Sequence, residues 1–285
     1  MLKQFPKVLA ICMVVCGCVR LGEEYRPRDL PAGGPTPEMI LQDLAANDAA
    51  IHTFRATGTF TLKSPELTAT QLLRESAIYF RTPTDLLVIG RKYGKQVFRL
   101  TCAGPQFIIE FPTEKEYYFR PQGERVEGVE GAVSPADIAR EMFLPEVWSE
   151  LDPRQARITA FDPEHGTAAM EILSGGLRRR PRRRLLLEGV PWIVRRSELL
   201  DREGRIVAIT SKDAYHEQDG VRFPTQVESV FFVQDAFMRF DMRELFLNTP
   251  IDDTQFDILS RLRFVAGRRY QPIGSPEPEK KNRRR

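Results

Sequence analysis

Hydrophobic and polar side chains alternate along the chain from residue 54 onward. Every second residue from Phe54 to Leu62 is hydrophobic or small and the residues between them are polar or basic, which predicts a strand. Turn-forming residues separate further strand-like runs, which occupy residues 72–80, 86–91, 96–102, 107–111, 116–120, 155–161, 168–173, 185–188, 192–200, 206–215, 221–232 and 237–246. The pattern predicts a meander of antiparallel strands, with hairpin turns at residues 201–204 and 218–220.

Two segments replace this alternation with helical spacing. Thr36 followed by Pro37 is a typical helix start, and an apolar stripe then runs from Ile40 to Ile51. A second helix is predicted to begin at Ser134, with an apolar face made of Ile138, Met142, Phe143, Val147, Trp148 and Leu151. Roughly a dozen strands and two helices suit one mainly β (α+β) domain.

The first eighteen residues have the features of an export signal. Two lysines and no acid precede an uncharged apolar run, residues 8–15, which is too short to span a bilayer. The run ends in Val15-Cys16-Gly17-Cys18, which resembles the lipobox of bacterial lipoproteins, where an acylated cysteine becomes the mature N-terminus. Cys18 is the better candidate for lipid attachment and Cys16 the second. The alternative is an ordinary cleaved signal peptide with incidental cysteines.

Composition divides the chain into four parts. Residues 1–17 form the predicted signal peptide, and residues 18–36 form the lipidated cysteine and a flexible linker rich in Pro and Gly. Such a linker could reach on the order of 55 Å. Residues 37–265 form the predicted folded domain, and residues 266–285 form a Pro-rich, basic tail that we expect to be disordered.

Overall composition narrows the function classes. The chain has 285 residues, of which 42% are hydrophobic, with 42 basic and 39 acidic side chains. These values disfavour a disordered chain, a multi-span membrane protein and a general nucleic-acid-binding surface. Cys102 is the only cysteine beyond residue 18, so we expect it to be a buried apolar side chain rather than part of a disulfide.

Candidate catalytic chemistry is sparse. The three histidines show no metal-ligand spacing, and the sequence contains no H-E-x-x-H, G-x-S-x-G or P-loop pattern. Acidic pairs such as Asp252-Asp253 occur in turn contexts, where capping explains them. We therefore expect a protein that is not an enzyme and that uses neither a metal nor a cofactor.

Several sequence phrases together resemble the LolA/LolB superfamily of lipoprotein-sorting proteins. They follow the lipobox and the first helix in the family's order: residues 54–60 (FRATGTF), 78–83 (IYFRTP), 214–224 (AYHEQDGVRFP) and 247–256 (LNTPIDDTQF). The resemblance covers roughly residues 37–258. It implies a curled antiparallel half-barrel of about eleven strands, with helices covering a concave apolar face that holds acyl chains.

The resemblance also has consequences for location and for one arginine. LolA-type carriers are soluble and periplasmic, whereas LolB-type acceptors are outer-membrane lipoproteins, and the lipobox makes this chain more similar to the second kind. LolA-type carriers have an arginine directly before the hairpin proline that holds the lid closed. Here Thr82 separates Arg81 from Pro83, so the chain departs from that pattern.

An acyl-chain cavity is also suggested by strands that are apolar on both faces, such as residues 86–89, 107–109 and 185–187. In a sheet curled around a cavity, apolar side chains can face the cavity without being covered by other core side chains. Plain core packing is the alternative reading, above all for Met142 and its neighbours. The candidate lining residues are Phe60, Leu62, Leu87, Ile89, Phe98, Leu100, Phe107, Ile109, Met142, Phe143, Val147 and Trp148.

A run of arginines interrupts the second half of the chain and is read as an exposed hairpin loop after Gly175-Gly176. Guanidinium groups bind phosphates in bidentate geometry, so contact with anionic lipid headgroups is one reading and a solvated loop is the other. The candidate contact residues are Arg178, Arg179, Arg180, Arg182, Arg183 and Arg184.

These features predict a membrane-anchored, non-enzymatic protein that binds acyl chains of lipoproteins or lipids, in the periplasm-facing envelope. A carrier or acceptor protein is a possible partner. Val19 after Cys18, rather than aspartate, favours the outer membrane. The alternatives are an interaction or sensor lipoprotein that binds a protein partner on the same scaffold, and a structural envelope protein with a filled core.

Overall fold

The computed structural model describes residues 23–24, 34–65, 67, 69–104, 106–120, 142–143, 148–175 and 179–272. Its strands are β1 (Glu23–Glu24), β2 (Thr53–Lys63), β3 (Gln71–Arg81), β4 (Asp85–Lys92), β5 (Lys95–Ala103), β6 (Gln106–Phe111), β7 (Glu116–Arg120), β8 (Ala156–Asp162), β9 (Thr167–Leu173), β10 (Pro181–Glu188), β11 (Ile193–Leu200), β12 (Ile206–Gln218), β13 (Val221–Phe231), β14 (Ala236–Leu247) and β15 (Gln271–Pro272). Every strand predicted from the alternation of side chains is present.

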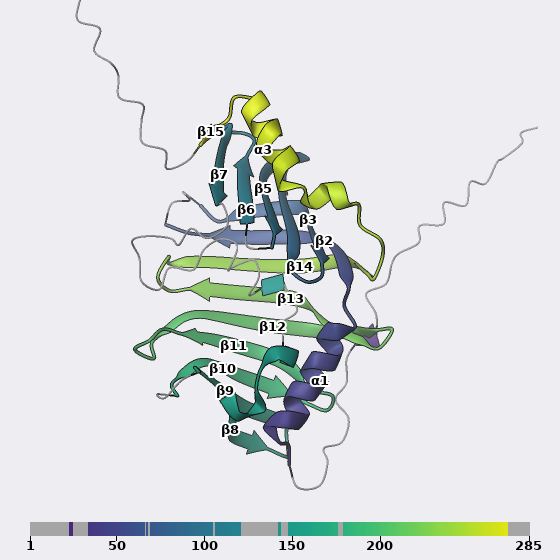
Figure 1. Ribbon diagram of the computed structural model, residues 1–285, viewed down its shortest axis with the longest axis vertical. Coiled ribbons are helices and arrows are strands. Elements are labelled where there is room, and N and C mark those ends of the chain that lie inside the picture. The colour runs from purple at the N-terminus through teal and green to yellow at the C-terminus, as the bar shows by residue number, and fades with distance from the viewer. Residues whose placement is uncertain are drawn as a thin grey trace, which may run out of the picture.

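All of these strands belong to one curled, unclosed sheet (Figure 1). The order across it is β15-β7-β6-β5-β4-β3-β2-β14-β13-β12-β11-β10-β9-β8, with β1 paired to β12. Neighbours are antiparallel except at the short β15–β7 pair. The mainly β half-barrel predicted from sequence is confirmed, and the described residues form fifteen strands where the family resemblance implied about eleven. Thirteen of them match the strand-like runs in the sequence. The other two, β1 and β15, have only two residues each and therefore show no alternation.

The first helix, α1 (Pro37–Ala49), lies across the inner face of the sheet, defined here as the face that carries Phe60 and Phe240 (Figure 1). Thr36 caps α1 as predicted, because its Oγ1 accepts the backbone N–H of Met39 at 3.3 Å. The buried side chains of α1 pack against the sheet strands β8–β11 and against Trp148; they are Ile40, Leu41 and Leu44.

The outer face is covered by a 3₁₀ turn, η3 (Asp253–Phe256), and a helix, α3 (Ile258–Gly267), which lies over β5 and β6 (Figure 1). Helix α3 was not predicted from the sequence, and the predicted helices were expected over the concave face. Asp257 caps α3 by accepting the Ser260 N–H at 2.9 Å. Helix α3 ends at Gly267 and β15 covers Gln271–Pro272, so regular structure extends past residue 266, where the disordered tail was predicted to begin.

A buried carboxylate fixes α3 to the sheet. Glu110 on β6 is fully buried, and Arg261 on α3 donates to both of its oxygens, with Nε 2.7 Å from Oε1. Arg99 on β5 lies 3.9 Å from the same carboxylate and donates to the Gln255 carbonyl at 2.9 Å. Burial and the nearby charge of Arg261 lower the pKa of Arg99 to about 10, so Arg99 remains charged at neutral pH. One acid therefore links Arg99 of the sheet to Arg261 of α3. We call η3 and α3 together the outer cover.

Several predicted features lie wholly or partly outside the described residues. Of the helix predicted from Ser134, only Met142 and Phe143 are described as helical, followed by the 3₁₀ turns η1 (Trp148–Glu150) and η2 (Pro153–Gln155). The lipobox, including Cys18, lies outside the described residues, as do Val147 and Arg178. Within the described part of the chain, no helix has the length and apolar character needed to cross a membrane.

Candidate functional site

A small, largely apolar hollow lies between α1 and the inner face of the sheet. Its volume is about 100 Å³, which is below the roughly 300–1,000 Å³ of typical small-molecule sites. We call it the inner hollow. It is lined by Leu44, Asn47, Asp48, Ile51, Phe54, Met142, Phe143, Trp148, Trp192, Ile193, Val194, Lys212, Tyr215, Arg222, Phe223, Pro224, Val227, Met242, Leu245 and Leu247.

Three of the predicted lining residues contribute to the inner hollow: Met142, Phe143 and Trp148. Their exposed fractions of 2%, 6% and 7% show that they are also packed core residues. The two readings of this face are therefore compatible, because the same side chains form the core and one wall of the hollow.

Most of the other predicted lining residues belong to solid core next to the hollow. Phe60 is fully buried, and its ring centroid is 4.5 Å from that of Phe240 and 5.8 Å from that of Phe143. Phe98 packs at the edge of this core over Gly90, where a Cβ atom would overlap its ring. The remaining members, in the same cluster or at its edge, are Leu62, Leu100, Phe107 and Ile109.

Two predicted lining residues point away from the inner hollow. Leu87 and Ile89 lie on the outer face of β4 and pack against Phe256 of η3. Their assignment to the cavity is corrected, because β4 is buried on both faces and its outer residues are covered by a segment far along the chain. Residues 185–187 are apolar on both faces of β10, but only one of these faces is buried, since Leu186 is 44% exposed.

Polar contacts pin α1 to the sheet beside the inner hollow. Asn47 pairs with the backbone of Arg222 on β13: its Oδ1 accepts the Arg222 N–H at 2.7 Å, and its Nδ2 donates to the Arg222 carbonyl at 3.0 Å. Asp43 accepts the Trp192 N–H at 3.1 Å, and the Arg222 guanidinium donates to the Asp43 carbonyl at 3.3 Å. Sequence reasoning missed this polar set, because its members are separated by as many as 179 positions.

Asp48 is the unusual acid of the inner hollow. Its Oδ2 is buried and accepts no hydrogen bond. Burial raises the pKa of Asp48 to about 7, although the positive charges of Lys212 and Arg222 and a hydrogen bond from Asn47 favour the ionised form. The carboxyl group of Asp48 therefore titrates much closer to neutral pH than an exposed aspartate does.

We expect Asp48→Asn to stabilise the protein increasingly as pH rises. The folded state holds the Asp48 proton up to about pH 7, whereas an unfolded aspartate releases it near pH 4. Asp48 therefore costs stability progressively between these values, and the cost is constant above them. Allowing for its partial exposure, the gain is about 1–2 kcal/mol at pH 8 and near zero at pH 4.

Urea denaturation at both pH values measures this effect. Asp219→Asn, on the exposed β12–β13 turn, controls for the loss of one negative charge. An equal gain at pH 4 and pH 8 for Asp48→Asn would contradict the assignment.

The arginine run is only partly a loop. Pro181 begins β10, so Arg182, Arg183 and Arg184 lie within a strand that pairs with β9 and β11, which corrects the prediction of an exposed hairpin loop. Arg184 is compensated by Glu171 at 3.3 Å and Glu198 at 3.9 Å. The five predicted contact residues that the structure describes therefore do not form one uniform patch.

Arg182 and Arg183 line a second, open hollow of about 480 Å³, which we call the arginine groove. Trp148 belongs to the walls of both the arginine groove and the inner hollow. The other residues of the arginine groove are Glu150, Leu151, Gln155, Ile172 and Leu199.

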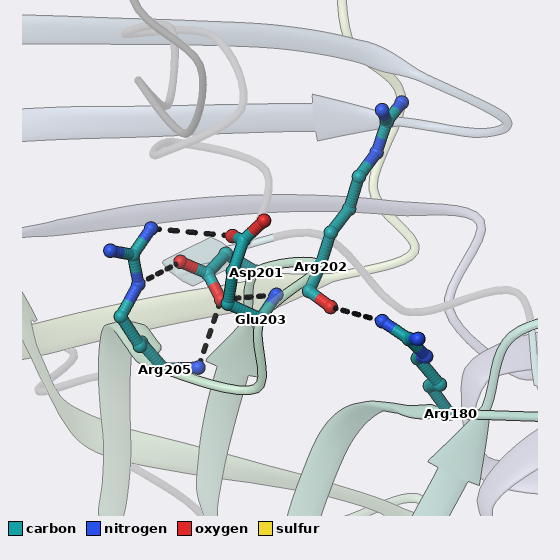
Figure 2. A network of polar contacts seen from close by, with 5 residues as sticks. All are labelled: Arg180, Asp201, Arg202, Glu203 and Arg205. Atoms are coloured by element: carbon teal, nitrogen blue, oxygen red, sulfur yellow. Dashed lines mark hydrogen bonds and ion pairs between the residues drawn. The ribbon is translucent and has the colours of Figure 1, made fainter.

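The remaining described arginines of the run point elsewhere. Arg179 donates to the Arg154 carbonyl at 3.2 Å, and Arg180 donates to the Arg202 carbonyl at 3.1 Å. Figure 2 shows Arg180 reaching from the start of β10 to the β11–β12 turn, where Asp201 accepts from Arg205 Nε at 2.7 Å. These contacts tie two neighbouring hairpin ends together.

Clusters of metal ligands are absent from the described residues. Cys102 is fully buried within the inner core, as the sequence analysis expected. Arg81, before the hairpin proline Pro83, pairs with Asp85 and Asp253 and stacks over Phe256, so its contacts are on the outer face. It does not contact α1 in any of these interactions.

The fold is that of the LolA/LolB-like proteins, a class of curled half-barrels with a helix across the inner face. No protein-family profile and no curated protein sequence matches the chain. Similar solved structures include a LolA superfamily protein from Nitrosomonas europaea, with 15% identity and a TM-score of 0.52 over 80% of this chain and 100% of the other.

Two further structures give the same result. A domain from Vibrio parahaemolyticus, provisionally named an outer membrane lipoprotein-sorting protein, has 12% identity and a TM-score of 0.54 over 79% of this chain and 97% of its own. A DUF1329 family protein from Desulfovibrio piger has 14% identity and a TM-score of 0.55 over 79% and 99%. At these identities the similarity establishes the fold and not the ligand.

Proposed function

We propose that this protein is a non-enzymatic acyl-chain-binding protein that acts in lipoprotein or lipid transport and sorting in the cell envelope. The observation that carries the proposal is the inner hollow, which lies between a helix and the inner face of a LolA/LolB-like sheet and is lined mostly by apolar side chains. The name of the Vibrio parahaemolyticus domain supports the same class of function.

The inner hollow must widen to admit a chain. Its 100 Å³ corresponds to only a few water molecules, at about 30 Å³ each. Outward movement of α1 from β13 would break the two Asn47 hydrogen bonds and the Arg222–Asp43 hydrogen bond, each of which contributes roughly 0.5–1.5 kcal/mol. A twelve-carbon chain gains about 0.8 kcal/mol per buried methylene, or roughly 10 kcal/mol in total. The gain from burying the chain exceeds the loss of these contacts.

Attachment to the membrane is part of the proposal and rests on the amino-terminal sequence. We propose that Cys18 carries the lipid anchor, on the basis of the lipobox-like Val15-Cys16-Gly17-Cys18. An anchored acyl-chain binder with its folded part facing the periplasm matches the LolB-like type, and the outer membrane is the proposed site. A carrier or acceptor protein is the proposed partner in transfer.

The second candidate function is an interaction or sensor module that binds a protein partner on the same scaffold. The small volume of the inner hollow favours it, because a nearly filled core serves as well for a rigid docking surface. The two functions differ in whether binding depends on free volume beneath α1.

Uptake of a fluorescent sixteen-carbon fatty acid by the full chain tests the proposal. Leu245→Trp places an indole in the inner hollow, where Leu245 is 2% exposed. Since overpacking costs about 1–3 kcal/mol and 1.4 kcal/mol is a factor of ten, we expect binding to weaken about tenfold or more. Leu186→Trp, at an exposed position of β10, is the matched control and should leave uptake unchanged.

Acyl-chain binding is refuted if the unmodified protein takes up no fatty acid and if native mass spectrometry finds no co-purified lipid. A protein partner that binds Leu245→Trp and the unmodified protein equally well would favour the sensor function.

A further inference from the structure

Two hollows of different chemistry meet at one side chain. Trp148 is 7% exposed and lies in the cluster that joins α1 to the sheet, together with Leu44 and Trp192. One hollow that it lines is the mostly apolar inner hollow, and the other is the open arginine groove. Trp148 therefore separates a place suited to a hydrocarbon chain from a place suited to an anion.

The arginine groove combines positive charge with an apolar floor. Arg182 is exposed and Arg183 is half-buried, while Ile172 is 2% exposed. Gln155 adds amide hydrogen-bonding groups, and the described lining residues also include one acid, Glu150. The nearby acid Glu171 is not among the lining residues, and its carboxylate is engaged by Arg157 at 2.5 Å and by Arg184 at 3.3 Å.

The position of the two arginines distinguishes them from the rest of the run. The guanidinium groups of Arg179 and Arg180 donate to backbone carbonyls of Arg154 and Arg202, outside the residues that line the groove. Figure 2 shows Arg180 directed at the β11–β12 turn. The groove is therefore a local feature of Arg182 and Arg183 and not a general property of a basic hairpin.

Arginine favours phosphate as the ligand of such a groove. Its planar guanidinium presents paired N–H donors that match two phosphate oxygens, and these charge-assisted hydrogen bonds are about twice as strong as neutral ones. An apolar neighbour such as Ile172 lowers the local dielectric and strengthens the contact further.

We propose that the two hollows together accept one amphiphile with a phosphate-bearing headgroup. Its chain occupies the widened inner hollow, its phosphate binds Arg182 and Arg183 in the arginine groove, and Trp148 packs against the junction between chain and headgroup. This inference rests on the proposed acyl-chain binding and narrows it to phosphate-bearing lipids as the ligand class.

Displacement of a fluorescent fatty acid by two single-chain amphiphiles of equal length tests the inference. Dodecyl phosphate and dodecanol share the chain and differ in the headgroup. In 0.15 M salt, where the Debye length is about 8 Å, long-range attraction is screened. We expect dodecyl phosphate to bind about tenfold more tightly than dodecanol, the ratio that one or two charge-assisted hydrogen bonds supply.

Two double variants locate the effect. Arg182→Ala with Arg183→Ala should remove the preference for dodecyl phosphate and leave the affinity for dodecanol unchanged, which also shows that the variant is folded. The matched control, Arg179→Ala with Arg180→Ala, removes the same charge from the same hairpin and should preserve the preference.

Three outcomes separate the hypotheses. Equal affinity of the unmodified protein for dodecyl phosphate and dodecanol overturns the inference and needs no variant. Equal loss of preference in both double variants also overturns it, since it indicates general charge attraction. Failure of both amphiphiles to bind refutes the proposed function itself.

Discussion

Glu110→Gln is expected to lower the free energy of unfolding by about 3–5 kcal/mol, the range found when one partner of a buried ion pair is removed. Glu110 is fully buried and accepts two hydrogen bonds from Arg261, with Arg99 3.9 Å away. The substitution keeps the shape of the side chain and leaves two arginines facing each other without a negative charge. Urea denaturation measures the change.

Hydrogen exchange shows where the stability is lost. We expect the amides of α3, Ile258–Gly267, to lose protection, because Arg261 is the polar link between α3 and β6. Asp241→Asn is the matched control: its partner Arg239 is 2.8 Å away, and both side chains are more than a third exposed. Such surface pairs contribute only about 0.2–1 kcal/mol. A loss for Glu110→Gln no larger than that of the control would show that the Glu110 charge does not stabilise the outer cover.

The strands of this fold were predictable because each strand carries its own signal. Side chains alternate with a period of two along β2, and the β12–β13 turn at Asp219-Gly220 has positive φ angles of 51° and 77°, as expected of Asp-Gly in a tight turn. The start of α1 is likewise local, since Thr36 and Pro37 specify it together. Local sequence patterns were sufficient to predict those elements whose structure is determined by neighbouring residues in the chain.

The sequence of α3 in the outer cover also carries a local helical pattern. Ile258, Leu262 and Val265 recur at helical spacing after the capping residue Asp257, and Ile258 and Val265 are buried against Ile108. The orientation of β4 is a different case. Because both faces of this strand are buried, Leu87 and Val88 look alike in sequence, and only the docking of η3 decides which residue faces outward.

The polar end of the inner hollow could not be predicted from any single segment. Asp48 has a raised pKa because the packing of α1 against β12 and β13 buries it at the edge of an apolar hollow, and this burial outweighs the nearby positive charges of Lys212 and Arg222. The two hydrogen bonds that fix this arrangement join Asn47 to a residue 175 positions away. A site assembled by tertiary docking leaves no spacing pattern in the sequence.

Trp148→Ala is expected to lower the free energy of unfolding by about 3–5 kcal/mol, because it removes a large buried side chain and leaves a cavity. Trp148 is 7% exposed and packs with α1 and Trp192. Its loss also removes the wall between the inner hollow and the arginine groove. The enlarged space should accept a hydrocarbon chain without displacement of α1.

Ligand-dependent stability distinguishes this cavity from ordinary core damage. A ligand that binds only the folded state stabilises it by about 2.7 kcal/mol at a concentration of 100 times its Kd, so dodecanol should restore much of the stability that Trp148→Ala loses. Phe256→Ala is the matched control, since Phe256 is 3% exposed but packs with Leu87 and Ile89 on the outer face. It should be destabilised without rescue. Equal rescue of both variants, or of neither, would mean that the space around Trp148 does not take up a chain, and the inner face of the sheet would then be a packed core.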